Sequence, residues 1–572
     1  MISLIVLATI AIFTVAYFVY GGFISRQMSL DDNRSTPAHQ LNDGVDFVPA
    51  KASLLLGQHF SAIAAAGPIV GPILAGMWFG WLPAWLWIIL GAIFIGGVHD
   101  FTTLTASVQH RAASVGEIAK RYLPPRTHIF FLIFIWLALL YVITAFTDIT
   151  GQTFRAVAAA QASSPKSGTA FGPGVAASSI LYLGLAVAMG VLLYRFKLKL
   201  WIATVIFLPL VLSAVWIGPR LPAPMLDLLG SISAKEWDVF LLAYCFIASI
   251  IPVWLLLQPR GYLGGWLLYL TIVIGLIGAL FGGFKIEYPA LNLSGLRSLT
   301  NGSLVFPFLF ITVACGACSG FHAVVSSGTT SRQLNKESDA RPIGYGAMLL
   351  EGLVAVLALA TVMMISPGSS QLKTDPNLIY ADGLARYLGL LGVGFDIAFP
   401  FALLAFSTFV YDTLDVSTRL ARYVLQELTG WRGFQGGCLA TAISLIVPAV
   451  FLLSAKEKAY LVAWPIFGTS NQMLASLSLL AVAAWLRRSG RRSFYVIVPM
   501  LFMLTTTVVA LVLQIQPFVR SLAGLSGAGP PKTEVVISGV CGIILLMLGG
   551  LAGVTALKSV LCEGGLKRAG SS

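Results

Sequence analysis

The stretch Gly67-Pro68-Ile69-Val70-Gly71-Pro72 places two Gly-Pro pairs inside an apolar segment that runs from residue 54 to residue 77. A proline within a helix removes one backbone hydrogen bond and clashes with the preceding turn, at a cost of about 3 kcal/mol or more. In a membrane no water satisfies the freed backbone groups, so irregular backbone must be buried in protein or line a cavity. The stretch therefore predicts an interrupted helix beside a cavity.

The composition of the whole chain indicates a membrane protein. Of its 572 residues, 57% are hydrophobic and 10% are charged, whereas soluble domains average about 25% charged residues. This composition excludes a soluble globular protein. The net charge of +13 does not indicate nucleic-acid binding, because most basic residues lie in short loops between apolar segments, where topology signals are found.

About 15 segments are long and apolar enough for spanning helices, which need about 20 residues each. The first has no basic n-region and no cleavage site, so we expect a retained helix rather than a signal peptide. The fold class is therefore predicted to be an all-α polytopic membrane protein. The predicted spans are 1–21, 54–77, 83–107, 128–150, 175–194, 199–217, 238–258, 262–283, 303–329, 343–365, 396–416, 435–454, 459–486, 494–514 and 534–556.

The basic residues predict the topology. Alternate loops, beginning with residues 22–53, hold 24 of the 36 lysine and arginine residues, and most of these loops are the shorter ones. Positively charged loops stay in the cytoplasm. We therefore expect the N-terminus outside and the C-terminus in the cytoplasm.

A weak internal repeat appears when the chain is laid on itself with an offset of about 180 residues. Each copy would hold five helices, so the second copy would enter the membrane from the opposite side, which is typical of secondary transporters. Evenly spaced helices could give such an offset by chance. Against chance, Ser249-Ile250-Ile251-Pro252 places a second proline 184 residues after Pro68.

The repeat divides the chain into four predicted regions. They are an N-terminal helix and cytoplasmic linker (1–53), inverted repeat one (54–217), inverted repeat two (238–430) and additional C-terminal helices (435–572). Inverted-repeat transporters bind substrate at the discontinuous helices between the repeats. The predicted substrate-binding residues are Gly67, Pro68, Gly71, Pro72, Ser249 and Pro252.

Ionisable residues at membrane depth are functional candidates by default. Imidazole titrates near neutral pH, and burial favours the protonated carboxyl group, so both suit proton coupling. For Asp100, which follows His99, and for His322 we favour a functional role, whereas for Glu351 and Asp412 we favour hydrogen bonding at a helix interface. No arginine is expected at mid-depth, so an anionic substrate would be bound by backbone N–H groups at half-helix N-termini.

Small and hydroxyl residues are concentrated from Cys315 to Thr330. They favour close helix packing, but hydroxyl groups beside unwound carbonyls also coordinate Na⁺ or relay protons. The predicted proton- or ion-coupling residues are His59, Asp100, Ser319, His322, Ser326 and Ser327. The six cysteines form no paired metal-ligand pattern, so we expect small core residues, no metal site and no cofactor beyond the coupling ion, H⁺ or Na⁺.

At these residues the chain resembles the carbon starvation protein A family of bacterial inner-membrane peptide and pyruvate transporters. The resemblance covers about residues 35–510. It is carried by Thr36-Pro37-Ala38, Asn42-Asp43-Gly44-Val45-Asp46-Phe47-Val48-Pro49, Gly57-Gln58-His59-Phe60-Ser61-Ala62-Ile63, Gly96-Gly97-Val98-His99-Asp100-Phe101, Ile247-Ala248-Ser249, Pro252-Val253-Trp254, Gln258-Pro259-Arg260, Ser319-Gly320-Phe321-His322, Ser327-Gly328-Thr329-Thr330 and Phe467-Gly468-Thr469-Ser470-Asn471-Gln472. It implies the amino acid/polyamine/organocation superfamily fold with five plus five inverted helices, which is LeuT-like. Gln58 stands where many members carry a second histidine, and the chain is shorter than the larger members.

The favoured function is proton-coupled import of a small carboxylate, most simply pyruvate, across a bacterial inner membrane. The main alternative is import of short peptides, with Asp148 as a counter-charge for the amine. More remote alternatives are a Na⁺-coupled transporter and a membrane sensor. An enzyme is not expected, because the metalloprotease pattern H-E-x-x-H and the nucleophile motif G-x-S-x-G in a strand-turn-helix context are missing.

Overall fold

The computed structural model describes residues 1–43, 47–156, 171–252, 254–292, 305–455, 459–523 and 533–562, and this part of the chain contains helices and no strand. The predicted all-α class is confirmed. The long helices are α1 (Ile2–Gln27), α8 (Pro125–Thr153), α9 (Gly172–Tyr194), α10 (Leu200–Ile217), α12 (Ala234–Ile250), α13 (Leu257–Phe281), α17 (Ala347–Met363), α19 (Phe395–Thr429), α20 (Gly433–Ser454), α21 (Ala459–Arg488), α22 (Phe494–Leu522) and α23 (Thr533–Cys562). Shorter segments are α2 (Pro37–Gln40), α3 (Ala52–Ile63), α4 (Gly67–Phe79), α5 (Trp81–Gly91), η1 (Ala92–Gly96), α6 (Gly97–Gln109), α7 (Val115–Tyr122), η2 (Gly218–Arg220), α11 (Ala223–Ser231), η3 (Val305–Leu309), α15 (Phe310–Thr312), α16 (Gly320–Gly328), η4 (Thr330–Arg332), η5 (Glu337–Asp339), η6 (Arg341–Gly346), η7 (Ser370–Lys373) and α18 (Pro376–Gly389).

Every predicted span overlaps helical structure in the described residues. Within that part of the chain, 11 helices are long and apolar enough to cross a membrane, or 12 if the bent pair α3 and α4 is one span. The three other predicted spans coincide with α12, with the divided segment from η3 to α16, and with α23. The total of about 15 therefore stays a prediction.

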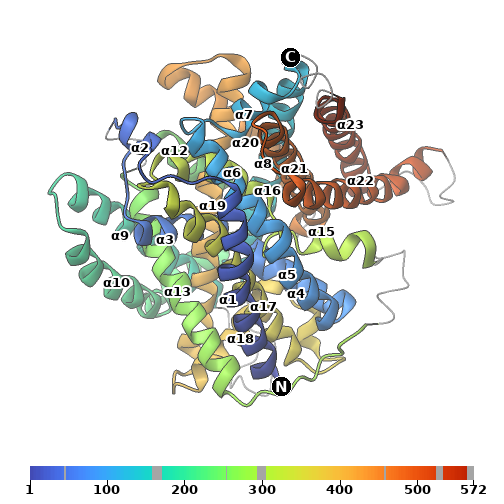
Figure 1. Cartoon of the computed structure of the whole chain (residues 1–572). Helices are drawn as coiled ribbons and strands as arrows, with labels where there is room; N and C mark the ends of the chain where they lie inside the picture. Colours follow the sequence, from blue (N-terminus) through green and yellow to red (C-terminus); the bar gives the residue numbers. More distant parts are fainter. Residues whose placement is uncertain are drawn as a thin grey trace, which may run out of the picture.

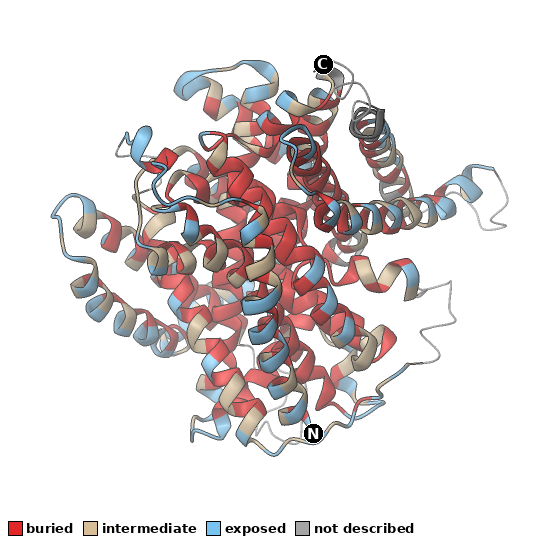
Figure 2. Ribbon diagram, in the orientation of Figure 1, coloured by how far each residue is buried: buried red, intermediate tan, exposed pale blue. Residues whose placement is uncertain are grey.

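The bundle has a buried centre and an exposed periphery (Figures 1 and 2). The most apolar windows of α19 and α21 are 94% and 100% buried, whereas those of α1 and of the span containing α10 are 28% buried. Large apolar side chains on the outer helices are exposed, among them Phe18 and Trp201. Such patches are rare on soluble proteins and mark contact with lipid or a partner. α21, which belongs to the predicted additional C-terminal helices, thus lies in the buried part of the bundle, and the four predicted regions stay a prediction.

The first interrupted span is confirmed, but its prolines do not form the break. α3 ends at Ile63, α4 begins at Gly67, and the two helices meet at an angle of 47°. Ala64, Ala65 and Ala66 lie between them. Pro68 occupies the first turn of α4, where its missing N–H costs no hydrogen bond, and Pro72 lies inside α4.

The predicted break at Pro252 is wrong as an interruption within a span. α12 ends at Ile250 and α13 begins at Leu257, so Pro252 is an exposed residue of the connection between two helices. A proline forces the preceding residue out of the helical conformation, and Ile251 has the extended angles φ −72° and ψ 156°. Because the paired prolines were its main support, the five-plus-five repeat remains a prediction.

The second interrupted segment lies instead between α15 and α16, at residues 313–319. Gly316 has a φ of +86°, which a residue with a side chain rarely adopts. This segment packs directly against the start of α4. A Cβ atom on Gly67 would lie 2.4 Å from Cys315 Cβ, and one on Gly71 would lie 2.5 Å from the carbonyl oxygen of Thr312. The two glycines therefore permit the close approach of the two interrupted segments.

Side chains from three other helices satisfy the backbone of the second interruption. Trp87 of α5 donates from Nε1 to the carbonyl oxygen of Val313 at 3.0 Å. Glu351 of α17 accepts the N–H of Gly316 at 3.1 Å, and Asn471 of α21 accepts that of Phe321 at 2.9 Å. Gln472 of α21 donates to the carbonyl oxygen of Phe310. These bonds replace the helical ones, as a buried irregular backbone requires.

Loops that we predicted on the same side of the membrane are in contact with one another. Thr36 donates to the carbonyl oxygen of Leu334 at 2.7 Å, and Gln109 donates to that of Met28 at 3.2 Å. At the opposite end, the N–H of Glu287 donates to the carbonyl oxygen of Met363 at 2.8 Å. Figure 1 shows α2 and α7 at one end of the bundle and the N-terminus at the other. The alternation of sides thus fits the structure, while the assignment of the cytoplasmic side stays a prediction.

A buried ion network joins α12, α13 and α19. Arg260, which is fully buried, donates from Nε and Nη2 to Asp412 at 3.0 and 2.8 Å, and from Nη1 to Asp415 and Tyr244. Ser61 of α3 donates to the other oxygen of Asp412. Arg260 was predicted to be a loop charge, but α13 begins at Leu257 and carries Arg260 into the bundle in its first turn. The interior therefore holds an arginine that we did not predict.

The close approach at Gly71 predicts a selective loss of stability. Alanine at this position must displace the Thr312 backbone, so we expect Gly71→Ala to lower the free energy of unfolding by about 1–3 kcal/mol. Thermal unfolding of the purified protein in detergent measures this change. The control is Gly184→Ala on α9, where no atom lies within 4 Å of an added Cβ. Equal unfolding temperatures for the two variants would contradict the proposed packing constraint.

We expect the members of the Arg260 network to depend on one another for the stability of the fold. Arg260→Met leaves Asp412 and Asp415 buried without their cation, which typically destabilises a protein by about 3–5 kcal/mol. The triple variant Arg260→Met, Asp412→Asn, Asp415→Asn removes all three charges and should recover part of the loss. Thermal unfolding compares the two variants. If the triple variant were the less stable one, Arg260 would not be held by charge pairing.

Candidate functional site

The centre of the bundle contains a chain of titratable side chains from three helices. Asp100 of α6, His322 of α16 and Glu351 of α17 are each 0% exposed. His322 Nδ1 lies 2.7 Å from Asp100 Oδ2, and His322 Nε2 lies 3.3 Å from Glu351 Oε2. The predicted pair Asp100 and His322 is thus in direct contact. Glu351, for which we favoured hydrogen bonding at a helix interface, is the third member of this cluster.

Asp100 is bonded by two histidines. His99 Nδ1 lies 2.7 Å from Asp100 Oδ1, while His322 Nδ1 approaches the second oxygen. An ionised carboxylate only accepts hydrogen bonds, so both Nδ1 atoms carry the proton. The Nε2 atom of His322 is thereby directed to Glu351, although its angles are not those of a hydrogen bond within the described residues.

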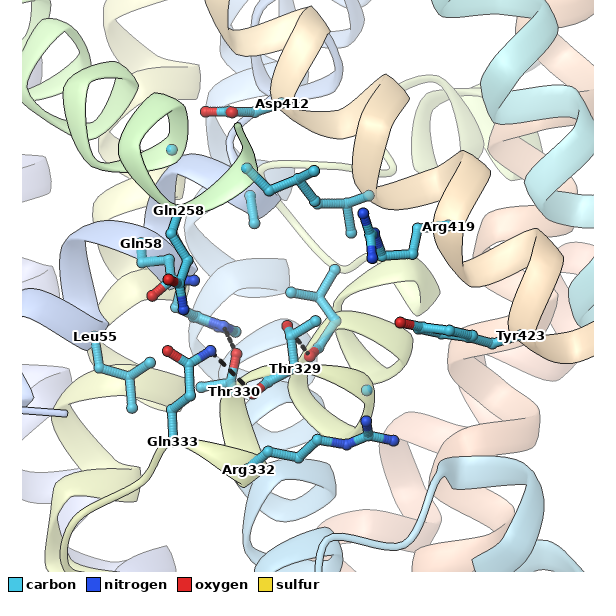
Figure 3. Close-up of a pocket in the computed structure, with 17 residues that line it drawn as sticks. Leu55, Gln58, Gln258, Thr329, Thr330, Arg332, Gln333, Asp412, Arg419 and Tyr423 are labelled. Carbon is cyan, nitrogen blue, oxygen red and sulfur yellow. Dashed lines mark hydrogen bonds between the residues drawn. The ribbon is translucent and has the colours of Figure 1, made fainter. Parts of the chain in front are cut away.

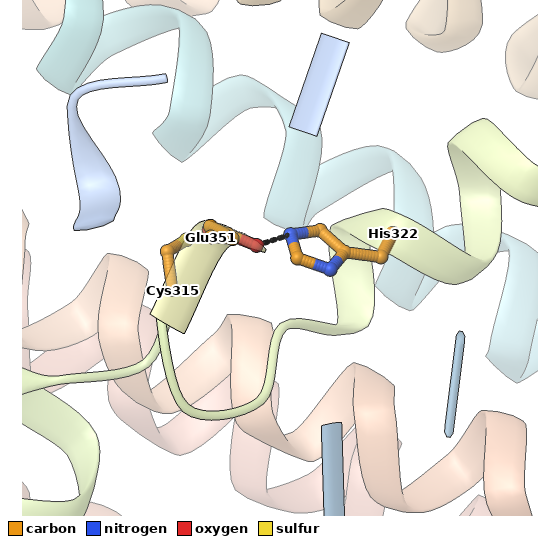
Figure 4. Close-up of side chains that lie close together, drawn as sticks. All are labelled: Cys315, His322 and Glu351. Carbon is orange, nitrogen blue, oxygen red and sulfur yellow. Dashed lines mark ion pairs between the residues drawn. The ribbon is translucent and has the colours of Figure 1, made fainter. Parts of the chain in front are cut away.

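Glu351 connects this chain to the interrupted backbone. Its Oε1 accepts the N–H of Gly316, while its Oε2 faces His322 (Figure 4). With His99 neutral, a charged His322 beside two ionised carboxylates leaves one negative charge uncompensated in a fully buried place. Because a buried unpaired charge is strongly unfavourable, the site requires a further positive charge, which a proton can supply.

Cys315 raises the question of a metal ion, since its sulfur and one ligand atom each of His322 and Glu351 lie within 4.8 Å of one another. The sulfur donates to Ser319 Oγ at 3.6 Å and accepts from Asn471 Nδ2 at 3.6 Å. A thiol that donates a hydrogen bond keeps its proton, whereas metals bind thiolates. We therefore interpret Cys315 as a packing residue, and the expected absence of a metal site stays a prediction.

The predicted serines occupy different places. Ser319 contacts Asn471 beside the central chain, at 2.9 Å from its Nδ2. Ser327 donates to the carbonyl oxygen of Ala323 and accepts the N–H of Val115, so it packs α16 against the start of α7. Ser326 is fully buried, and its Oγ has no hydrogen-bond partner in the described part of the chain. Of the three, Ser319 lies with the titratable cluster.

The predicted substrate-binding residues do not form one site. Gly67, Pro68, Gly71 and Pro72 are buried, and the two glycines pack against the second interruption. Ser249 lies on α12 and contacts Thr441 of α20 at 3.2 Å. Pro252 is exposed in the connection after α12.

A separate cavity of about 810 Å³, part of it open to solvent, lies between α3, α13, α16 and α19 (Figure 3). His59 is in its wall, with Nδ1 at 2.8 Å from Thr330 Oγ1, and Asp412 and Arg419 line it from α19. The cavity continues past Val325, one helical turn after His322 on α16. It thus lies beside the titratable chain. The lining residues are Leu55, Gln58, His59, Ala62, Leu257, Gln258, Gly261, Val325, Gly328, Thr329, Thr330, Arg332, Gln333, Asp412, Val416, Arg419 and Tyr423.

Sequence reasoning missed three residues of this region. Asn471 serves the interrupted backbone, and its motif was recognised only as a family likeness. Arg260 and Arg419 were assigned to loops, because each follows or precedes a predicted span. Only the burial of these three side chains reveals their roles.

Comparison with known proteins gives relatives along nearly the whole chain. The family model described as carbon starvation protein CstA matches residues 1–382 and 368–510. The peptide transporter CstA of Campylobacter jejuni is 33% identical over 90% of this chain and 80% of that protein. The peptide transporter CstA of Bacillus subtilis is 31% identical over 97% and 96%, and the pyruvate/proton symporter BtsT of Escherichia coli is 30% identical over 89% and 81%. Among solved structures, a manganese transporter of Eremococcus coleocola is 14% identical, with 91% of this chain and 99% of that chain covered and a TM-score of 0.45.

The family model and these relatives agree with the resemblance drawn from the motifs. The helices long and apolar enough to cross a membrane fit the same class of protein. The chain therefore belongs to the carbon starvation protein CstA family, and it is a multi-pass membrane transporter.

Proposed function

We propose that this chain imports a small carboxylate, pyruvate in the first instance, together with protons across a bacterial inner membrane. The observation that carries the proposal is the buried cluster of Asp100, His322 and Glu351, which lies at the interrupted span and places titratable groups in direct contact. Such a cluster takes up a proton when the surrounding helices close around it and releases the proton when water reaches it. Proton relays of carboxylate and histidine in membrane interiors are typical of pumps and transporters.

Proton coupling also fits the electrical cost of carrying an anion. Moving one negative charge inward against 100 mV costs about 2.3 kcal/mol. One proton that accompanies a monocarboxylate makes the step electroneutral, so the pH gradient alone drives uptake. Among the relatives, BtsT is named a pyruvate/proton symporter.

The main alternative is a short peptide, since several relatives are named peptide transporters. A zwitterionic peptide needs a counter-charge for its amine. Asp412 lines the cavity but is bonded to Arg260 and Ser61. Asp148, the earlier candidate, accepts the N–H of Tyr460 at 2.7 Å and does not line the cavity. The basic side chains Arg332 and Arg419 in the cavity wall favour an anion.

Coupling to Na⁺ is the second alternative. Na⁺ is bound by several oxygen atoms, and Ser319, Ser326 and Ser327 were the expected donors. Ser319 and Ser327 are engaged in hydrogen bonds with Asn471, Ala323 and Val115. Histidine at the centre of the cluster suits a proton better than it suits a hard cation.

The facing interruptions support alternating access, in which one half of the bundle rocks against the other. We infer that the second copy of any inverted repeat begins near Val305, at the second interrupted span, rather than at residue 238. The boundaries 54–217 and 238–430 would then shift, with α9 and α10 inserted in the first copy. The close packing of Gly67 and Gly71 on residues 312–315 is the observation that favours this register.

Transport in proteoliposomes tests the proton-coupled function. We expect uptake of labelled pyruvate to follow an imposed pH gradient without net current. In Asp100→Asn, gradient-driven uptake should fall to background while pyruvate exchange persists, because the proton site is lost and the substrate site is kept. The control is Asp148→Asn, which removes a buried carboxylate that lies outside the cluster of Asp100, His322 and Glu351. Uptake that ignores the pH gradient rejects proton coupling, a Na⁺ requirement favours the second alternative, and current with dipeptides favours the peptide.

The orientation is tested by labelling single cysteines in intact cells. We expect a membrane-impermeant maleimide to label Ser370→Cys from outside and to leave Asn33→Cys unlabelled, because the basic loops belong in the cytoplasm. Both positions are exposed. The signal is measured as an increment over the parent chain with its native cysteines. The reverse pattern would invert the topology.

A further inference from the structure

The cavity wall contains an arginine that is well placed to bind an anion. Arg419 of α19 is 6% exposed and lines the cavity. Its Nη2 donates to the carbonyl oxygens of Ala248 and Ile251, at 2.9 and 2.6 Å, at the end of α12. Its Nε is buried and has no hydrogen-bond partner in the described residues. Figure 3 shows the guanidinium between Asp412 and Tyr423, directed into the cavity.

His59, which lines the same cavity, also carries a buried nitrogen without a partner. The residue is 1% exposed, and its Nδ1 is held by Thr330 at 2.8 Å. Its Nε2 has no hydrogen-bond partner among the residues that the structure describes. A buried polar atom without a partner is costly, so two of them in the wall of one cavity indicate a polar ligand.

The charges beside the cavity identify the ligand as an anion. Arg260 is occupied by Asp412 and Asp415, since its Nε, Nη1 and Nη2 atoms all donate to them. Arg419 adds a second cation, whose bonds go to neutral carbonyl oxygens. The cavity wall itself holds two arginines, Arg332 and Arg419, and one aspartate, Asp412, so its basic groups outnumber its acidic ones and favour a carboxylate.

We propose that this cavity is the carboxylate-binding site of the transporter, with Arg419 as the residue that recognises the negative charge and His59 as its second donor. This inference rests on the proposed function and names the binding site that the sequence had placed at Gly67–Pro72. A short monocarboxylate is the class that fits, because one guanidinium edge and one imidazole nitrogen suit a single carboxylate. Gln58, Gln258 and Tyr423 line the same space and can donate to a neighbouring carbonyl oxygen of the ligand.

Arg419 also has a structural task, because its Nη2 satisfies the C-terminal carbonyls of α12. A purely structural role would weaken every ligand equally when the residue is changed. Recognition of charge would instead weaken only ligands that carry the carboxylate. A pair of ligands that differ in this one group therefore separates the two roles.

The test is binding of pyruvate and of its uncharged amide, pyruvamide, to the purified full chain in detergent by titration calorimetry. We expect the wild type to prefer pyruvate by at least about tenfold, as a charge-assisted hydrogen bond to arginine provides. Arg419→Gln should lose this preference by weakening pyruvate and leaving pyruvamide unchanged, and Arg419→Lys should restore part of it. Arg422→Gln, which removes a charge from the same helix outside the cavity, should keep the preference. His59→Gln should by itself reduce the preference for pyruvate. This variant replaces Arg419→Gln in the test if Arg419→Gln does not fold.

The outcomes separate this inference from the proposed function. If Arg419→Gln keeps the preference, or weakens both ligands equally, the inference is overturned while pyruvate uptake by the wild type is untouched. If the wild type neither binds nor carries pyruvate, the proposed substrate fails. The same titration with a dipeptide and its C-terminal amide then decides whether Arg419 recognises a carboxylate at all.

Discussion

The constraint on which the rest of this structure depends is the need to satisfy an interrupted backbone where no water is available. Residues 313–319 leave the helical conformation in the middle of the bundle, and the polar groups of this segment and of the start of α16 are met by Trp87, Glu351 and Asn471. The first interrupted segment packs closely on this one because Gly67 and Gly71 have no side chains. Helices α5, α17 and α21 are thereby fixed around one point, which explains why α21 is buried over its whole apolar window.

Glu351 gives this constraint a functional consequence. One of its oxygens holds the N–H of Gly316, and the other faces His322. A proton that binds between His322 and Glu351 therefore changes the charge on the same carboxylate that supports the interrupted backbone. In the proposed function this is a direct physical link between proton binding and the conformation of the segment that packs on α4. It does not need a signal to travel through the bundle.

The fold was largely predictable from hydrophobic patterning, because most of the predicted spans are long apolar helices in the described residues and lipid enforces helices. The site was predictable in part. Asp100 and His322 stood out since charge is rare in apolar stretches, whereas Glu351 and Arg260 required knowledge of which helices meet. The prediction of an interrupted span at Pro252 was wrong because proline ends a helix as readily as it interrupts one. The true second interruption depends on Gly316, whose positive φ no sequence pattern distinguished from that of any other glycine.

The separation of the two charged regions has its own logic. The central chain of Asp100, His322 and Glu351 is fully buried, while the cavity beside α19 opens toward solvent. If substrate and proton shared one site, the carboxylate of the substrate would compete with Glu351 for His322. In the proposed mechanism the anion binds at Arg419 and the proton at His322, which avoids this competition. His59 in the cavity wall lies on α3, in the last turns before the first interruption. In the proposed mechanism the two ligands therefore act beside different interruptions, because His59 precedes the first and Glu351 supports the second, and these two interrupted segments pack directly on each other.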